Sequence, residues 1–303
     1  MVAFNFENGN IDISCIDYES VYIHNYTLLK RFLNMKIMEG CSDNTIKTYN
    51  KYLAIFIESM VKRVEDVDTS LLKDYLIEYK ISRPINNTSL DSIRRCLCSF
   101  YSFLEDEDYI LKNPAKKLRK IKNEKIIRHP FSEDDLCKLK DACTNIRDLS
   151  LIDFLETSGV RVSELCSLNI SDINFDEREC IVYGKGRKER IVYFSSQCKV
   201  HLLKYLSTRI DDNPALFVNS ISLRAQRVSR GTVENLIHKI SKRAGVEGAY
   251  PHRFRRTLAT KLISRNVPIE QVQKLLGHSK IETTLIYAEV DQNNVKNSHR
   301  KYI

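Results

Sequence analysis

The chain has 303 residues, enough for one large domain or two ordinary ones, each with its own hydrophobic core. Apolar residues make up 43% of it and charged residues 29%, which excludes a disordered chain. No run approaches the roughly 20 apolar residues of a membrane span, and the N-terminus lacks a signal-peptide pattern, so we expect a cytoplasmic protein without membrane contact. The net charge of +9 favours a polyanionic partner such as nucleic acid.

The nine cysteines are scattered along the chain, with no CxxC pair and no Cys/His cluster at the spacing of a zinc site. We interpret them as reduced thiols buried in the protein. No HExxH motif is present to organise a catalytic metal. The sequence therefore predicts neither a metal nor another cofactor.

After a lead-in, the first part of the chain has the apolar spacing of helices. Residues 1–22 have no clear helical period, whereas residues 23–110 have one throughout. Ser42 can cap a helix whose apolar side chains recur at steps of three and four, at Ile46, Tyr49, Leu53, Phe56 and Met60. A later helix repeats the pattern at Leu90, Ile93, Leu97, Tyr101 and Leu104. These segments predict a bundle of four or five helices.

A basic linker, residues 111–130, is expected to separate this bundle from the rest of the chain. Between Lys112 and Arg128 it holds eight basic residues and one acidic residue. Such a run is either a solvated tether or a linker that also binds phosphate groups. The candidates for DNA-binding phosphate contacts are Lys116, Lys117, Arg119 and Lys120.

The remaining residues, 131–303, predict a second domain that is mostly helical. It opens with the sequence SEDDL, which can cap a helix. Two β-branched and aromatic runs, at 180–184 and 190–194, lie on either side of a glycine-containing segment, 185–189. This pattern predicts a β-hairpin. The expected fold class is thus mainly α with a small β-sheet, in two domains.

Three segments of the second domain carry side chains suited to chemistry on phosphate. They are SGVRVSEL at 158–165, YGKGRKER at 183–190, and the stretch from His252 to Tyr287. A tyrosine oxygen that cleaves a phosphodiester builds negative charge on the phosphoryl group, which the planar fork of arginine can neutralise. The leaving oxygen also needs a proton, which lysine or histidine can supply. His252 and Arg255, three residues apart, would share one face of a helix.

In their order and spacing these segments closely resemble the catalytic domain of the tyrosine recombinases, the phage integrase and Xer-like family. The resemblance covers roughly residues 25–290. It implies a SAM-like, core-binding helical bundle over residues 23–110 and a mixed α/β catalytic domain over residues 131–303. The site residues that it implies are the catalytic Arg161, Lys185, His252, Arg255, His278 and Tyr287 and the supporting Glu164.

Several of these assignments have a plainer alternative. Arg161 and Glu164, three residues apart, could form an ordinary surface ion pair that contributes little. Lys188 competes with Lys185 for the role of general acid. Arg256 stands where the family usually has a histidine after the HxxR motif, which puts that neighbouring position in doubt but leaves the arginine pair intact.

The resemblance implies an enzyme that cuts and rejoins double-stranded DNA through a 3′-phosphotyrosine and a Holliday junction. It would act as a homotetramer on two DNA recombination sites, with a related recombinase or an accessory DNA-bending protein as further partners. Its outcome would be integration and excision of a mobile element, or resolution of DNA dimers. The alternatives are a type IB topoisomerase with a similar site and a DNA-binding relative without catalysis. The compact two-domain layout and the sequences GKGRKER and LGHS look more like a recombinase than a topoisomerase, and the complete residue set argues against a relative without catalysis.

Overall fold

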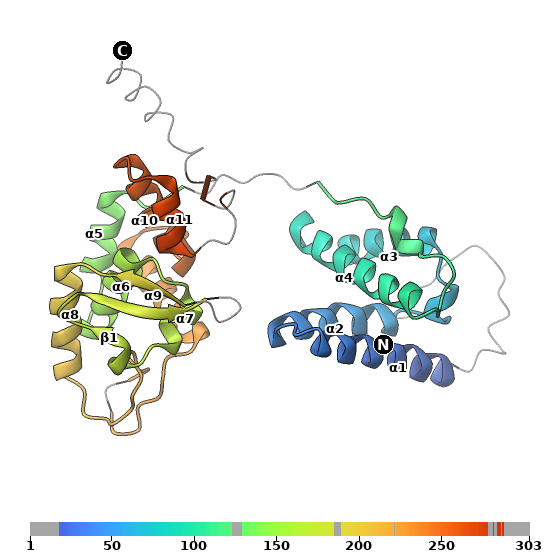
Figure 1. Ribbon diagram of the computed structural model, residues 1–303, viewed down its shortest axis with the longest axis horizontal. Coiled ribbons are helices and arrows are strands. Elements are labelled where there is room, and N and C mark those ends of the chain that lie inside the picture. Colours follow the sequence, from blue (N-terminus) through green and yellow to red (C-terminus); the bar gives the residue numbers. More distant parts are fainter. Residues whose placement is uncertain are drawn as a thin grey trace, which may run out of the picture. The chain divides into compact units, whose positions relative to one another are not determined.

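The computed structural model describes residues 18–122, 129–184, 189–220 and 222–277, together with residues 281, 284, 285 and 287. The chain divides into two compact units, Met1–Ile126 and Ile127–Ile303. Figure 1 shows both, and each is described by itself here. No helix among the described residues is both long enough and apolar enough to cross a bilayer.

The first unit is a bundle of helices. Its elements are α1 (Tyr18–Met38), α2 (Asp43–Glu58), α3 (Thr69–Ser82) and α4 (Asn87–Asp106), with the one-turn helices η2 (Val64–Asp66) and η3 (Pro114–Lys117). Ser42 caps α2, as expected, by accepting a hydrogen bond from the backbone of Thr45. The face predicted for α4 is confirmed, since its apolar side chains are all buried in the core of this unit.

The first helix begins earlier than the sequence pattern indicated. Tyr18–Tyr22 belong to α1, although residues 1–22 were expected to be an irregular lead-in. Tyr18, Tyr22 and Ile23 are exposed, and the buried positions of α1 start only at Asn25. An exposed first turn has no apolar period to detect, which explains the difference.

Most of the basic segment expected to be a linker packs against one unit or the other. Ala115 and Leu118 are buried in the core of the first unit, and the backbone N–H of Ile121 donates to Asp91 Oδ1 at 3.1 Å. At the other end, Arg253 Nε donates to the carbonyl of His129 at 3.2 Å. The strongly basic composition gave no sign of these two apolar contacts, and residues 123–128 of the expected linker lie outside the described residues.

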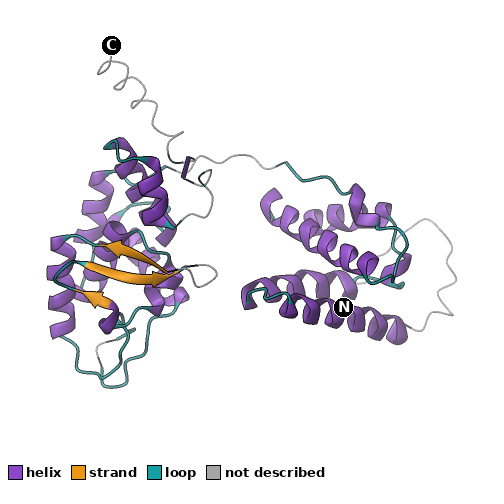
Figure 2. Cartoon of the chain, in the orientation of Figure 1, coloured by secondary structure: helices purple, strands orange, loops and turns teal. Residues whose placement is uncertain are grey.

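The second unit combines helices with one small sheet, which Figure 2 shows in orange. Its helices are α5 (Glu133–Asp141), α6 (Ile146–Ser158), α7 (Val162–Ser167), η4 (Ile170–Asp172), α8 (Ser196–Ser207), α9 (Arg230–Ala244), α10 (Pro251–Ser264) and α11 (Ile269–Leu276). The predicted cap of α5 is confirmed, because Ser132 and Asp135 form a reciprocal capping box. Eight of the 13 residues of α6 are buried, so this helix forms the centre of the unit.

The sheet has three antiparallel strands in the order β1-β2-β3. The expected hairpin is confirmed as β2 (Glu179–Tyr183) and β3 (Glu189–Tyr193), with Val182 opposite Arg190. The inner positions of the two strands, among them Cys180, Val182 and Val192, are buried in the core of the unit. β1 (Ile173–Asn174) was not expected, because two residues are too few to show an alternating pattern.

The cysteines that the structure describes are all free thiols. Cys96, Cys180 and Cys198 are buried, as expected, whereas Cys137 is exposed. Burial raises the pKa of the Cys96 thiol to about 11 and that of Cys180 to about 12. These buried thiols are therefore protonated at neutral pH and behave as small apolar side chains.

Candidate active site

The loop between α6 and α7 carries the first predicted arginine. Gly159 ends α6 in the left-handed conformation, with φ 61°, and Arg161 precedes α7 as its N-cap residue. Glu164 accepts hydrogen bonds from the Arg161 backbone at 2.7 Å and from its Nη1 at 2.8 Å. Glu164 is only 3% exposed, so this pair is not an ordinary surface ion pair.

The second arginine, Arg255, lies on α10 and is 1% exposed. Its Nη1 donates to the carbonyl of Gly159 at 2.7 Å, and its Nη2 donates to the carbonyl of Leu276. Its Nε has no hydrogen-bond partner among the described residues. Arg255 thus joins the ends of α6 and α11 and keeps one buried donor unused.

The two arginines meet at the C-terminal end of α11. Gly277 ends this helix in the left-handed conformation, with φ 64°. Its carbonyl accepts a hydrogen bond from Arg161 Nη2 at 3.1 Å, next to the Leu276 carbonyl that Arg255 uses. The carbonyl end of a helix carries partial negative charge, which stabilises these guanidinium groups.

Around the end of α11, the positive charge of the arginines is not fully neutralised by nearby carboxylates. Burial, and next the charges of Arg161 and Arg190, lower the pKa of Arg255 to about 9. Burial alone would raise the pKa of Glu164, but hydrogen bonds from Arg190 and from the Arg161 backbone outweigh it and hold that pKa below its ordinary value. Among the described residues, the ionised Glu164 is therefore the one carboxylate near these three arginines. A bound anion would stabilise the charged form of the buried Arg255.

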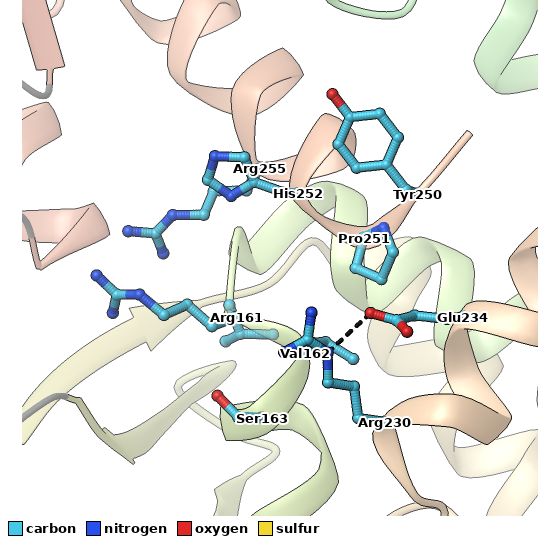
Figure 3. A pocket seen from close by; sticks show the side chains of 10 residues that line it. Arg161, Val162, Ser163, Arg230, Glu234, Tyr250, Pro251, His252 and Arg255 are labelled. Atoms are coloured by element: carbon cyan, nitrogen blue, oxygen red, sulfur yellow. Dashed lines mark hydrogen bonds and ion pairs between the residues drawn. The ribbon is translucent and has the colours of Figure 1, made fainter. Parts of the chain in front are cut away.

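A pocket of about 460 Å³ opens beside the arginines. Arg161, Arg255 and His252 line it, and in Figure 3 the guanidinium groups of the two arginines point in the same direction. The opposite part of the lining includes Arg230 and Glu234, which form an ion pair of 2.8 Å. His252 is exposed, so it can reach a group bound in the pocket although it shares a helix with the buried Arg255.

Tyr287 is 3% exposed and belongs to a small apolar cluster with Ala259, Val272 and Leu276. The guanidinium carbon of Arg256 lies 5.5 Å from the centre of its ring, at cation–π distance. Arg256 follows Arg255 in α10, and Leu276 ends α11. The tyrosine therefore packs on the same two helices that hold the second arginine.

The structure brings together Arg161, His252 and Arg255 around the pocket, with Glu164 bound to Arg161 behind it, and places Tyr287 on the adjoining helices. Lys185 and His278 lie outside the described residues. The predicted phosphate contacts belong to the first unit. Three of them are exposed without an ion-pair partner among the described residues, whereas Lys116 pairs with Glu105 at 2.7 Å.

The sequence reasoning missed Arg190, which joins the network from β3. Its Nη1 and Nη2 each donate to a carboxylate oxygen of Glu164 at 2.7 Å. Arg190 alternates with the buried Val192 and faces inward from the hairpin. An arginine at the inward position of a strand needs a buried partner, and this signal in the run RKERIVYF could have identified it.

Among the described residues, no group of three or more His, Cys, Asp or Glu side chains is arranged to hold a metal ion. The described charged groups that line the pocket are three arginines and Glu234, which pairs with Arg230, and His252 lies beside them. Such a set suits an anionic ligand, and phosphate matches the geometry of paired guanidinium groups.

An arginine pair with one buried member, close to a tyrosine and on a helical unit with a small sheet, fits the class of enzymes that cleave DNA with a tyrosine. Comparison with known proteins shows the family. The profile of the phage integrase family matches residues 129–294, and that of the phage integrase N-terminal SAM-like domain matches residues 28–111. The chain belongs to the phage integrase family and is an Xer-like tyrosine recombinase.

Two relatives extend over almost the whole chain. Tyrosine recombinase XerA of Pyrococcus horikoshii is 34% identical over 283 residues, which cover 92% of this chain and 94% of that protein. Tyrosine recombinase XerC of Thermodesulfovibrio yellowstonii is 33% identical over 280 residues, covering 87% and 91%. These relatives support site-specific recombination, the cutting and rejoining of DNA, as the activity of this chain.

Solved structures agree on the fold. The crystal structure of XerA recombinase has a TM-score of 0.53 at 29% identity and covers 92% of this chain and 98% of that one. The Tn1549 transposon integrase in complex with a circular intermediate DNA has a TM-score of 0.73 at 17% identity, covering 91% and 99%. A lambda integrase dimer bound to a core site has a TM-score of 0.71 at 20% identity, covering 86% and 94%.

Proposed function

We propose that this chain cuts DNA with Tyr287 and stabilises the transition state with Arg161 and Arg255. The observation that carries the proposal is the buried Arg255, which lines a pocket and has, among the described residues, neither a partner for its Nε nor a carboxylate to pair with. A buried cation in that condition is costly unless a ligand completes it. A DNA phosphate in the pocket would supply both the negative charge and the acceptor oxygens.

The reaction balances without a redox partner or a source of energy. The Tyr287 hydroxyl gives its proton to a general base, for which we propose His252; its oxygen attacks the phosphorus, and the bond from phosphorus to the 5′-oxygen breaks. This leaves a 3′-phosphotyrosine and a 5′-hydroxyl, whose proton comes from a general acid, for which we propose Lys185. The 5′-hydroxyl of the other DNA then attacks the phosphotyrosine and releases the tyrosine, so the phosphodiester energy is retained.

The remaining site residues would support this transfer. His252 lines the pocket and can donate to a non-bridging oxygen of the phosphate or move a proton there. We assign a similar role to His278, which follows Gly277 directly in the sequence. Glu164 would hold Arg161 in place through its two contacts to that residue. The arginines would then meet the developing charge without reorganising, which is the main source of such stabilisation.

We further propose that the enzyme acts as a homotetramer on two double-stranded DNA sites and passes through a Holliday junction. The first unit would bind the core site, with Lys116, Lys117, Arg119 and Lys120 as contacts to phosphate groups. A related recombinase or an accessory DNA-bending protein could join the assembly. The solved relatives support DNA as the substrate, since they include recombinases bound to their recombination sites. The exchange would integrate and excise a mobile element or resolve DNA dimers.

The test is covalent capture on DNA. The Tyr287→Phe protein, which lacks only the attacking oxygen, selects its own site from a library of random duplexes. The selected duplex is then nicked beside the scissile phosphate, so that cleavage releases a short fragment and the covalent complex accumulates. We expect a protein–DNA band on a denaturing gel with the wild-type chain and none with Tyr287→Phe, although both bind the DNA.

Tyr193→Phe is the matched control, since Tyr193 is an exposed tyrosine on β3. It should form the covalent band normally. A covalent band that persists in Tyr287→Phe would overturn the assignment of the nucleophile. A band that is attached to the 5′-end of the DNA would overturn the proposed direction of attack.

A further inference from the structure

Arg190 is held in an unusually complete set of contacts for a residue outside the predicted site. It lies on β3, where its side chain is 10% exposed. Two of its nitrogens donate to the two carboxylate oxygens of Glu164, each at 2.7 Å. Its third nitrogen, Nε, donates to the carbonyl of Leu275 at 3.1 Å. Each guanidinium nitrogen of Arg190 therefore has an acceptor within the protein, and none is directed to a ligand.

The stem of Arg190 also packs against the end of α11. A Cβ added at Gly277 would lie 2.7 Å from Arg190 Cδ and 3.2 Å from its Nε. Gly277 is in the left-handed region as well, with φ 64°. Only glycine therefore fits at this position, both for its conformation and for the approach of the arginine.

Three successive carbonyl groups at the end of α11 each accept a hydrogen bond from a different arginine. Leu275 accepts from Arg190 on β3, Leu276 from Arg255 on α10, and Gly277 from Arg161 at the start of α7. Of the three donors, Arg161 and Arg255 line the pocket, and Arg190 does not. The end of α11 is thus fixed to both arginines of the proposed clamp and, separately, to the hairpin.

We propose that Arg190 is a positioning residue, which sets the end of α11 and the clamp arginine Arg161 in register with each other. This inference rests on the proposed function. It follows from the two sets of hydrogen bonds that Arg190 makes. Its Nη1 and Nη2 bind Glu164, which in turn binds Arg161, and its Nε binds the Leu275 carbonyl. Because the chain runs from α11 through Gly277 toward Tyr287, the same contact sets where the nucleophile's segment starts relative to the phosphate clamp.

Loss of Arg190 would disturb chemistry more than DNA binding. Glu164 would keep Arg161, but the Leu275 carbonyl would lose its donor and Gly277 would lose the side chain that packs on it. A small shift of α11 relative to Arg161 misplaces the attacking oxygen, and a displacement of about 1 Å can cost about 100-fold in rate. The arginines that contact phosphate would remain, so DNA affinity should change little.

The experiment compares Arg190→Ala and Arg190→Lys with the wild-type chain on the nicked selected site. The first readout is the rate of covalent-complex formation at saturating DNA, corrected for the folded fraction of each protein, together with the DNA concentration at half-maximal rate. We expect about a 100-fold lower maximal rate for Arg190→Ala, with the half-saturating concentration nearly unchanged. Lysine keeps the charge but cannot bind Glu164 and the Leu275 carbonyl at the same time, so the maximal rate of Arg190→Lys should lie between those of the wild type and Arg190→Ala.

The second readout is hydrogen exchange in the DNA-free protein, which does not depend on activity. Amides of α11 should exchange faster in Arg190→Ala, whereas those of the central helix α6 should not. Arg224→Ala is the matched control, because Arg224 is an exposed arginine of the same unit, and it should match the wild type in both readouts. If Arg190→Ala does not fold, Arg190→Lys decides by the same measurements.

The two proposals fail in different ways. Absence of a covalent complex with the wild-type chain would count against the proposed function. Unchanged α11 exchange in a folded Arg190 variant would overturn the positioning role whatever the activity. Faster α11 exchange with a wild-type maximal rate would also overturn it, because the contact would then be structural only.

Discussion

Two cations of the second unit, the half-buried Lys140 and the buried Arg255, differ in the acceptors that surround them. Lys140 on α5 forms ion pairs with Asp153 at 2.9 Å and Glu156 at 2.6 Å. Burial alone would lower its pKa, but the hydrogen bonds that it donates to these two carboxylates outweigh burial and raise it. Among the described residues Arg255 has two carbonyl acceptors and no carboxylate partner, and burial lowers its pKa to about 9.

This difference suggests two roles: the charge of Lys140 stabilises the fold, whereas the charge of Arg255 is available to a ligand. In the Lys140 network, Asp153 also contacts His201, and Glu156 also lies 3.5 Å from Lys261. At the arginine site, Glu164 is the one carboxylate among the described residues that pairs with Arg161 and Arg190, and Arg255 keeps a donor without a partner there. The two sites therefore differ in how far carboxylates neutralise the cations.

The largest effect should come from the uncompensated site. Arg161→Ala or Arg255→Ala removes a charge-assisted donor for the developing dianion. Each should slow covalent-complex formation on the nicked site by roughly 100- to 1000-fold, as loss of a transition-state donor does. Single-turnover gels at saturating DNA measure this, with Arg224→Ala as the control. A loss of less than about tenfold would contradict the role of the pair as a clamp.

The compensated site should show the reverse. Lys140→Ala leaves Asp153 and Glu156 buried with fewer partners, and breaking a buried ion pair typically costs about 3 kcal/mol. The free energy of unfolding in urea should fall by that amount, while the cleavage rate per folded molecule stays the same. Lys138→Ala, an exposed lysine of the same helix, should change neither. A large loss of cleavage in folded Lys140→Ala would mean that this network belongs to the active site.

The same distinction can be drawn within the basic segment of the first unit. DNA affinity should fall by at least about tenfold between 50 and 200 mM salt, as several counterions are released. Lys117→Ala should weaken binding to all DNA sequences and lower the slope of log affinity against log salt by about 0.9. Lys116→Ala should change both less, because its ammonium group already pairs with Glu105. Equal effects of the two substitutions would show that this pair opens on DNA.

The smallest effect should be on the free energy of unfolding at acidic pH. The pKa of Glu164 is lowered in the folded protein, so its ionised form contributes stability above its unfolded pKa, and that contribution is lost as the pH falls. The stability difference between the wild-type chain and Glu164→Gln should therefore shrink as the pH drops from about 5 toward 3. Urea unfolding at several pH values measures it. Glu177→Gln, an exposed control, should show no such change; a constant gap for Glu164→Gln would contradict the lowered pKa.

Local patterns predicted most of the fold. The caps at Ser42 and Ser132 form as expected, because each depends on residues within one turn of a helix. The β2–β3 hairpin was found from strand alternation and turn glycines. The packing of Ala115 and Leu118 on the first unit was not, because it is a tertiary contact between two apolar side chains within a strongly basic run.

The site shows the same limit. The HxxR spacing correctly placed His252 and Arg255 on one helix, but it could not show that Arg255 is buried and His252 exposed. Arg190 escaped detection because its partners are distant in the sequence: Glu164 is 26 residues away and Leu275 is 85 residues away. Motif spacing identifies residues that act on a substrate more readily than residues that hold the others in place.

The connection between the two units is short once its ends are taken from the structure. Asn87 donates to the carbonyl of Lys122 on one side, and Arg253 donates to that of His129 on the other, so that only residues 123–128 intervene. If both units bind the same DNA, as proposed, such a connection raises the effective concentration of the second unit at its half of the site to the millimolar range. Two modest affinities then multiply, and neither unit needs to bind tightly by itself. Inserting residues within 123–128 should therefore weaken DNA binding by the whole chain.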